Sequence, residues 1–178
     1  KVDQDKTMYS WSAAPSYHLT EKANIYLSVG KNFWFPTPRY YAWAAEKASS
    51  NNMPKDLKPE ESLTYEMGYK HLINKSLNIS LTGFFTECKD KFASYYEESS
   101  WKGVKNIGES ETKGIEFEAD GKPCPFFGYR FAGSYLDTEW TKGEMRVYVH
   151  SSNIIKLKDM DGKEFVGVPE YCFTTGLD

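Results

Sequence analysis

Residues 77–85 read LNISLTGFF, and two classes of side chain alternate along this stretch. The odd positions carry Leu, Ile, Leu, Gly and Phe, whereas the even positions between them carry Asn, Ser, Thr and Phe. A period of two residues is typical of a pleated strand, because successive side chains point to opposite faces of a sheet. The stretch is also about as long as a tilted strand that crosses a bilayer. It predicts a strand with one apolar and one polar face.

The same alternation recurs along the chain, at about residues 7–19, 24–33, 61–72, 76–91, 104–120, 126–140 and 166–178. In each segment the odd positions are the more apolar, for example Ile25, Leu27, Val29, Tyr65 and Met67. Several even positions are charged, and charged side chains are costly in lipid but tolerated inside a wide, wet barrel. We therefore expect about seven antiparallel strands of a larger transmembrane β-barrel, an all-β fold.

The composition favours a membrane interface over a soluble core. Aromatic residues make up 16% of the chain, with thirteen Tyr and five Trp. Tyr and Trp are enriched where a membrane meets water. No run of about eighteen apolar residues suggests a membrane-spanning helix, and the net charge of −3 is too small and too evenly spread to indicate nucleic acid as a partner.

The predicted connections alternate in length. Short links fall near residues 20–23, 72–76 and 121–125, and long ones at 34–60, around 92–104, and at 141–165. Short periplasmic turns and long extracellular loops are typical of outer-membrane barrels. The prolines sit in these connections or at strand starts, except Pro15, which we expect to mark a bulge or an edge position.

The first long connection is a candidate ligand site. It gathers one cation and several aromatic rings, namely Trp34, Phe35, Arg39, Tyr40, Tyr41 and Trp43. Such a set can grip an anionic chelate or stack on a planar ligand. The alternative is an aromatic girdle at the outer rim, which needs no ligand. The alanine-rich residues 41–50 predict a short helix in this connection.

No cofactor, metal or catalytic site is expected. The cysteines Cys88, Cys124 and Cys172 are far apart in sequence and lack the close pairs of a zinc site. Residues 159–164 read DMDGKE, which faintly resembles a calcium loop but lacks the remaining oxygen ligands. A solvated turn is the expectation there.

Four stretches together resemble TonB-dependent outer-membrane receptors, in the order found in that family. They are YLSVGKNFWFPTP at 26–38, LKPEESLTYEMGYK at 57–70, NIGESETKGIEFEAD at 106–120, and the pair Val168-Pro169. The resemblance implies a barrel of about twenty-two strands with a plugged lumen. Residues 1–178 would be the central part of that barrel domain, without its plug domain or its final strands.

The resemblance also implies a location, partners and an activity. The location is the bacterial outer membrane, where the barrel contacts lipid. The partners are the TonB energy-coupling protein, engaged through an N-terminal region outside this chain, and a scarce nutrient. The activity is active uptake, with ferric siderophores or similar metal chelates as leading substrates.

Within the motifs, the even positions are expected to face the lumen and to act structurally. These residues are Glu66, Gly68, Lys70, Gly114, Glu116 and Arg130. We expect Glu66 and Glu116 to pair with cations of a plug or of the wall, such as Lys70 or Arg130. The glycines would leave room for a plug or let the strand bend.

Three rival functions remain open at this point. A soluble binding barrel of lipocalin type predicts apolar residues packed inside. An outer-membrane enzyme predicts a catalytic cluster at one rim. A passive, porin-like barrel predicts transport without energy coupling.

Overall fold

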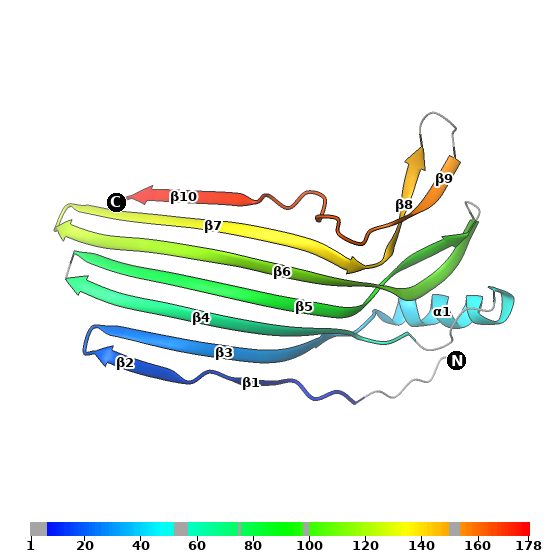
Figure 1. The fold of residues 1–178 in the computed structure, drawn as a ribbon, viewed down its shortest axis with the longest axis horizontal. Coiled ribbons are helices and arrows are strands. Elements are labelled where there is room, and N and C mark those ends of the chain that lie inside the picture. Colours follow the sequence, from blue (N-terminus) through cyan, green and yellow to red (C-terminus); the bar gives the residue numbers. More distant parts are fainter. Residues whose placement is uncertain (1–6, 52–56, 75, 98–99, 150–153) are drawn as a thin grey trace.

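The computed structural model describes residues 7–51, 57–74, 76–97, 100–149 and 154–178, and its main feature is one large antiparallel sheet (Figure 1). Eight strands form this sheet in the order β1-β3-β4-β5-β6-β7-β10, with β2 also pairing with β3. They are β1 (Trp11–Ala13), β2 (Ser16–Thr20), β3 (Ala23–Trp34), β4 (Glu60–Asn74), β5 (Leu77–Glu97), β6 (Ser100–Cys124), β7 (Phe127–Lys142) and β10 (Tyr171–Leu177). The predicted all-β antiparallel fold is confirmed.

The first predicted strand is broken at Pro15. Both β1 and β2 pair with β3, so the eight strands occupy the seven predicted positions. Between them the Pro15 carbonyl accepts a hydrogen bond of 3.0 Å from the Leu27 amide. Proline has no N–H to donate, and it is tolerated at an edge or a bulge for that reason. The expectation for Pro15 is confirmed.

The connections segregate to the two ends of the sheet (Figure 1). The short turns after β2, β4 and β6 lie together at one end, as predicted. The predicted loop at 92–104 is wrong, because β5 and β6 continue as a paired hairpin to Glu97 and Ser100. Their register shifts between Cys88 and Phe92, which interrupts the alternation that the prediction used. The connection at 141–165 carries an unpredicted hairpin of β8 (Glu144–Val149) and β9 (Ile154–Asp159).

Helix α1 (Pro38–Asn51) lies in the first long connection. The Thr37 carbonyl accepts hydrogen bonds from the amides of Tyr40, at 2.9 Å, and Tyr41, at 3.3 Å. Pro38 opens the helix at a position whose N–H would have no partner within it. The predicted helix at 41–50 is confirmed and begins three residues earlier. Within the described residues, no helix is both long and apolar enough to span a membrane.

The strand register places odd-numbered residues opposite odd-numbered ones from β3 to β10 through most of the sheet. We call the side of the odd residues the apolar face and the side of the even residues the polar face. One cross-strand row of the apolar face reads Leu27, Met67, Gly83, Ile115, Tyr135 and Tyr171. Leu27 is 52% exposed and Leu81 48% exposed. These residues therefore do not form the packed interior that a lipocalin-type barrel requires.

The apolar face ends at a row of charged residues. Toward the long connections, the row after that of Leu27 and Met67 reads Val29, Tyr65, Phe85, Lys113 and Asp137. The row after it, which we call the charged row, reads Lys31, Leu63, Glu87, Glu111 and Glu139. Ion pairs mark this limit: Lys113 lies 3.1 Å from Asp137, and Lys31 lies 2.6 Å from Glu61. On β6, the residues of the apolar face between Lys113 and the turn are Ile115, Phe117, Ala119 and Gly121.

Candidate functional site

On the polar face, Tyr26 of β3 lies across Gly68 of β4. A Cβ atom at Gly68 would overlap the Tyr26 ring. The Tyr26 hydroxyl is 3.1 Å from the Thr82 hydroxyl. The Lys70 ammonium is 5.4 Å from the centre of the same ring. The absent side chain of Gly68 thus allows one tyrosine to join three strands.

A second glycine of the polar face accommodates a neighbouring ring in the same way. At Gly114 of β6, a Cβ atom would lie 2.7 Å from the Phe84 ring and 2.6 Å from the Tyr135 carbonyl oxygen. The space that the sequence left for a plug at Gly68 and Gly114 is therefore occupied by rings of this wall. Both glycines are buried.

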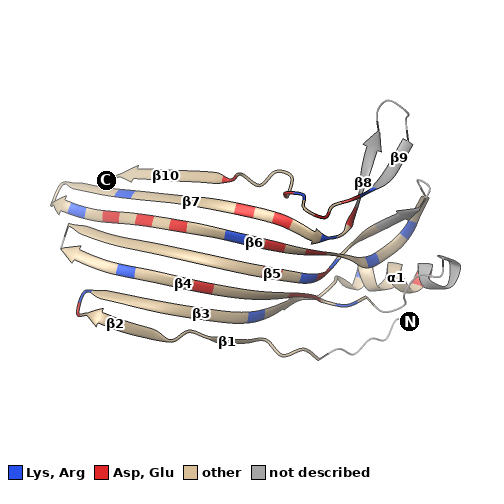
Figure 2. Cartoon of the chain, in the orientation of Figure 1, with Lys and Arg blue, Asp and Glu red and all other residues tan. Residues whose placement is uncertain are grey.

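The charged residues at even-numbered positions lie together on the polar face of the sheet, as the alternation in the sequence predicted. Glu116 and Glu118 are exposed on β6, which carries a series of acidic residues in Figure 2. Arg130 lies opposite Asp120, whose carboxylate accepts a hydrogen bond of 3.2 Å from Asn78. Among the described ion pairs, none joins Glu66 or Glu116 to Lys70 or Arg130. The expected pairing within the wall is not formed by these residues.

At the opposite end from the turns, α1 packs against the extended part of β6. Leu57 and Val104 are each 1% exposed and form a small core with Ala44. The rings of Phe92, Tyr40, Trp43 and Trp101 follow one another edge to face, with centroids 5.4 to 5.7 Å apart. Edge-to-face contacts of this kind add stability beyond the buried area. We call this set, with Tyr41, the helix cluster.

The helix cluster divides the predicted ligand residues into two groups. Tyr40, Tyr41 and Trp43 pack against its core. Trp34 is 70% exposed, and Arg39 is exposed with its guanidinium 5.3 Å from the Trp43 ring. Only the second group presents a free surface to a ligand.

Asn106 of β6 is a positioning residue that the sequence did not single out. Its side-chain oxygen accepts a hydrogen bond of 2.9 Å from the Lys58 amide, and its nitrogen donates to the carbonyls of Lys58 and Asp90. Asp90 has a φ of 56°, a left-handed conformation rare outside glycine. The amide joins β6 to the chain entering β4 and to the irregular part of β5. In the sequence, the role of Asn106 is indicated only by an amide side chain in the middle of a strand, because the residues that it contacts are far away in the chain.

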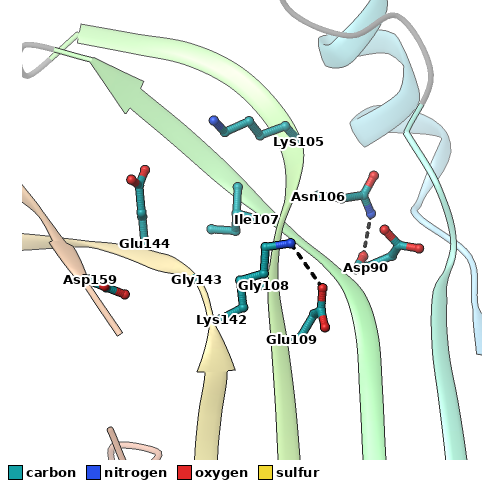
Figure 3. A pocket seen from close by; sticks show the side chains of 10 residues that line it. All are labelled: Asp90, Lys105, Asn106, Ile107, Gly108, Glu109, Lys142, Gly143, Glu144 and Asp159. Atoms are coloured by element: carbon teal, nitrogen blue, oxygen red, sulfur yellow. Dashed lines mark hydrogen bonds and ion pairs between the residues drawn. The ribbon is translucent and has the colours of Figure 1, made fainter. Parts of the chain in front are cut away.

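A polar pocket of about 460 Å³ lies where β8 leaves the sheet (Figure 3). Its lining mixes cations and carboxylates, and comprises Asp90, Lys105, Asn106, Ile107, Gly108, Glu109, Lys142, Gly143, Glu144 and Asp159. Lys142 reaches Glu109 at 3.3 Å. Gly143 has a φ of 152°, and a Cβ atom there would lie 3.2 Å from the Ile107 carbonyl oxygen. Glycine is therefore needed where the chain turns away.

A cation that contacts two rings lies near this pocket. The Lys91 ammonium is 5.8 Å from the centre of the Trp140 ring and 5.6 Å from that of Phe165, and the two rings are 5.1 Å apart. Sequence reasoning missed this group because its members come from three separate segments.

Cysteine and acidic residues form no metal site in the described part of the chain. Cys88, Cys124 and Cys172 are free thiols. Residues 159–164 form the expected turn, in which the Asp161 amide donates to the Asp159 carboxylate at 3.0 Å. Gly162 follows with a φ of 69°.

A family model matches the whole chain, and known proteins match most of it. A family model described as "TonB dependent receptor-like, beta-barrel" covers residues 1–178. The chain is 25% identical over 143 residues to "Catecholate siderophore receptor Fiu" from Escherichia coli, a match covering 79% of this chain and 18% of the relative. It is 26% identical over 134 residues to "Probable TonB-dependent siderophore receptor PiuA" from Acinetobacter baumannii, covering 75% and 17%.

The fold agrees with a solved structure of the same kind. The crystal structure of the ferric-catecholate import receptor Fiu from Escherichia coli superimposes with a TM-score of 0.69 at 20% identity, covering 94% of this chain and 22% of that one. The chain spans about a fifth of the length of these relatives. Because the family model covers every residue, the chain belongs to the TonB-dependent receptors and forms part of their β-barrel in the outer membrane.

Proposed function

We propose that the protein containing this chain takes up a scarce nutrient across the outer membrane, with energy supplied through TonB. A ferric siderophore or a similar metal chelate is the proposed substrate. The observation that carries this proposal is the match of the barrel family over the whole chain. The names of the relatives Fiu and PiuA support the substrate class.

The proposal includes an orientation for the two faces of the sheet. The apolar face contacts hydrocarbon, and the polar face lines a watery lumen. Two observations support this orientation. The apolar row from Leu27 to Tyr171 is exposed, and the apolar face ends at the charged row that contains Lys31 and Glu87. Charged side chains are least costly where water reaches them, and Glu116, Glu118 and Arg130 all lie on the polar face.

The polar face is proposed to hold a plug domain by charge. Glu116 and Glu118 are exposed, so a cationic surface inside the lumen is a suitable partner for them. Gly68 and Gly114 contribute by admitting Tyr26 and Phe84, which stiffen the wall. Lys70 supports the same tyrosine. The plug and the strands that close the barrel are proposed to belong to other parts of the parent protein.

The ligand is proposed to meet Trp34 and Arg39 at the extracellular mouth. The exposed indole of Trp34 offers a stacking surface, and the exposed guanidinium of Arg39 offers charge to an anionic chelate. Trp43, held with Tyr40 and Tyr41 in the helix cluster, supports Arg39 through its ring. Transport, and not catalysis, is the proposed activity.

Energy-dependent uptake by the full-length receptor tests the proposed function. Cells that carry it are expected to accumulate radioactive iron from ferric siderophores, and to lose this uptake when TonB is deleted. Uptake that persists without TonB would favour the passive, porin-like alternative. Hydrolysis of the chelate by the purified receptor would favour the enzyme.

Binding by variants of the mouth tests the proposed ligand residues. Trp34→Ala and Arg39→Ala are each expected to weaken chelate binding about tenfold, which corresponds to roughly 1.4 kcal/mol. Lys22→Ala removes an exposed cation at the turn end and is the matched control. Unchanged affinity in both mouth variants would assign this region to the girdle alternative.

A further inference from the structure

The apolar face is not uniform, because a groove of about 650 Å³ crosses it near β1. Its walls come from β1, β3, β4 and β5 and from Pro15. The mostly apolar lining comprises Ala13, Pro15, Leu27, Ser28, Val29, Tyr65, Glu66, Met67, Gly83, Phe84 and Phe85. The volume lies within the range of protein sites for small molecules. Leu27, Tyr65 and Met67 keep between 46% and 63% of their surface exposed.

Small residues create the groove and larger ones form its walls. A Cβ atom at Gly83 would find only the Gly114 carbonyl oxygen, 4.0 Å away, so the protein leaves this space unfilled. Met67 and Leu27 rise on one side of Gly83 in the same cross-strand row. The stacked rings of Tyr65 and Phe85, with centroids 6.5 Å apart, stand at the end nearer the long connections.

The position of the groove indicates its occupant. Its residues belong to the last two rows before the charged row that contains Lys31 and Glu87. On the proposed orientation these rows lie in the outer leaflet, just beneath the headgroups. An apolar space open to hydrocarbon stays free of water and is filled by hydrocarbon. The groove is also continuous with the surface by which the barrel contacts the membrane.

We propose that the groove is a binding site for one acyl chain of an outer-leaflet lipid. The chain lies over Gly83 and against Leu27 and Met67, and its upper part lies against the rings of Tyr65 and Phe85. This inference rests on the proposed orientation of the two faces. It goes beyond that orientation, because a membrane-facing band alone predicts equal lipid contact along a row.

Leu27 and Ile115 provide a matched pair for the test. They lie in the same row and are 52% and 54% exposed, and both have aliphatic side chains of equal size. Leu27 lines the groove, whereas Ile115 does not. Contact with an unstructured layer of lipid should therefore label the two residues equally.

The experiment is photolabelling of the full-length receptor in vesicles of phosphatidylethanolamine and phosphatidylglycerol that contain a phospholipid with a diazirine in its acyl chain. We expect label at Leu27 to exceed label at Ile115 by about threefold or more, the excess that a preference of roughly 0.65 kcal/mol produces. Gly83→Leu fills the floor and should remove the excess. Ala119→Leu introduces the same side chain on the apolar face outside the groove and should retain the excess.

Each other outcome has a distinct meaning. Equal label at Leu27 and Ile115 would overturn the groove as a lipid site and leave the orientation intact. Less label at Leu27 than at Ile115 would overturn it in favour of a protein occupant. Label confined to the polar face, for example at Thr82 and Ser134, would overturn the orientation and the lipid site together. The wild-type comparison needs no variant, so misfolding of Gly83→Leu would not obscure the result.

Discussion

The half of the sheet near the short turns and the half near the long connections are built by different means. In the turn half, the strands keep one register except in the last residues before the turns, each face has one character, and rings lie over Gly68 and Gly114. In the loop half, β5 and β6 are bulged, and the fully buried residues Leu57 and Val104 belong to the helix cluster. A membrane demands the same two faces along every strand, whereas water allows local packing to decide.

The largest expected effect is that of Gly114→Leu, because the turn half has no space for a side chain there. Its Cβ atom would lie 2.6 Å from the Tyr135 carbonyl oxygen and 2.7 Å from the Phe84 ring. We expect the full-length receptor to fail to assemble, as measured by surface level and by a heat-modifiable band on gels. Gly83→Leu is the control, since its nearest neighbour is 4.0 Å away. Normal assembly of Gly114→Leu would remove the distinction between the two glycines.

The next effect belongs to the loop half and should remain there. Leu57→Ala opens a cavity in the helix cluster and is expected to cost about 2–3 kcal/mol locally, the lower part of the range for such changes. Hydrogen exchange and proteolysis at residues 38–46 should rise, while barrel assembly stays normal. Loss of the whole barrel would mean that the two halves fold as one unit. Leu72→Ala, at an exposed position near a turn, is the control.

A smaller effect tests whether a glycine is required at position 68 because the Tyr26 ring lies over it. Gly68→Ala displaces Tyr26 and is expected to destabilise the receptor by about 1–2 kcal/mol. In a Tyr26→Ala background the same change should cost almost nothing, because the overlapping ring is gone. Denaturant unfolding of the wild-type receptor, the two single variants and the double variant in detergent measures this coupling. Additive effects would show that Gly68 is needed for another reason.

The smallest effect concerns the border between the two halves. Lys31 and Glu61 form an ion pair of 2.6 Å with side chains about one third exposed. Lys31→Ala is expected to lower stability by only about 0.2–1 kcal/mol, and less at high salt, because exposed ion pairs are screened. Thermal unfolding at two salt concentrations checks this. A loss that is larger and independent of salt would make the border pair part of the structural core.

Much of the turn half was predictable because its pattern repeats in the chain. The strand positions, the apolar odd row from Leu27 to Met67 and the short turns follow from local alternation and spacing. In the loop half the prediction placed a loop at 92–104, where β5 and β6 pair. That segment lies beyond the membrane-spanning part of the strands, so no apolar face is required there. The alternation of apolar and polar residues is therefore interrupted, and the pairing of β5 with β6 depends on contacts outside the two strands. The β8–β9 hairpin escaped prediction in the same region.

The sequence predicted which residues make up the candidate ligand site, but it did not predict which of them are exposed and which pack in the helix cluster. The first long connection was identified by its aromatic residues and one arginine, but five similar candidates gave no reason to separate Trp34 from Tyr40. The separation depends on Phe92 and Trp101, which approach from another hairpin. Lys91 and its two rings were missed for the same reason.

By itself, the sequence determined the strands of the turn half and their two faces, because alternation repeats every two residues and depends on the surrounding solvent. The spacing of the strands determined the end of the sheet at which the short turns lie. The tertiary structure alone decided which partner each side chain meets: Tyr26 over Gly68, Trp43 against Trp101, and an unfilled space over Gly83. Those contacts depend on register between strands distant in the chain, and no local pattern carries that information.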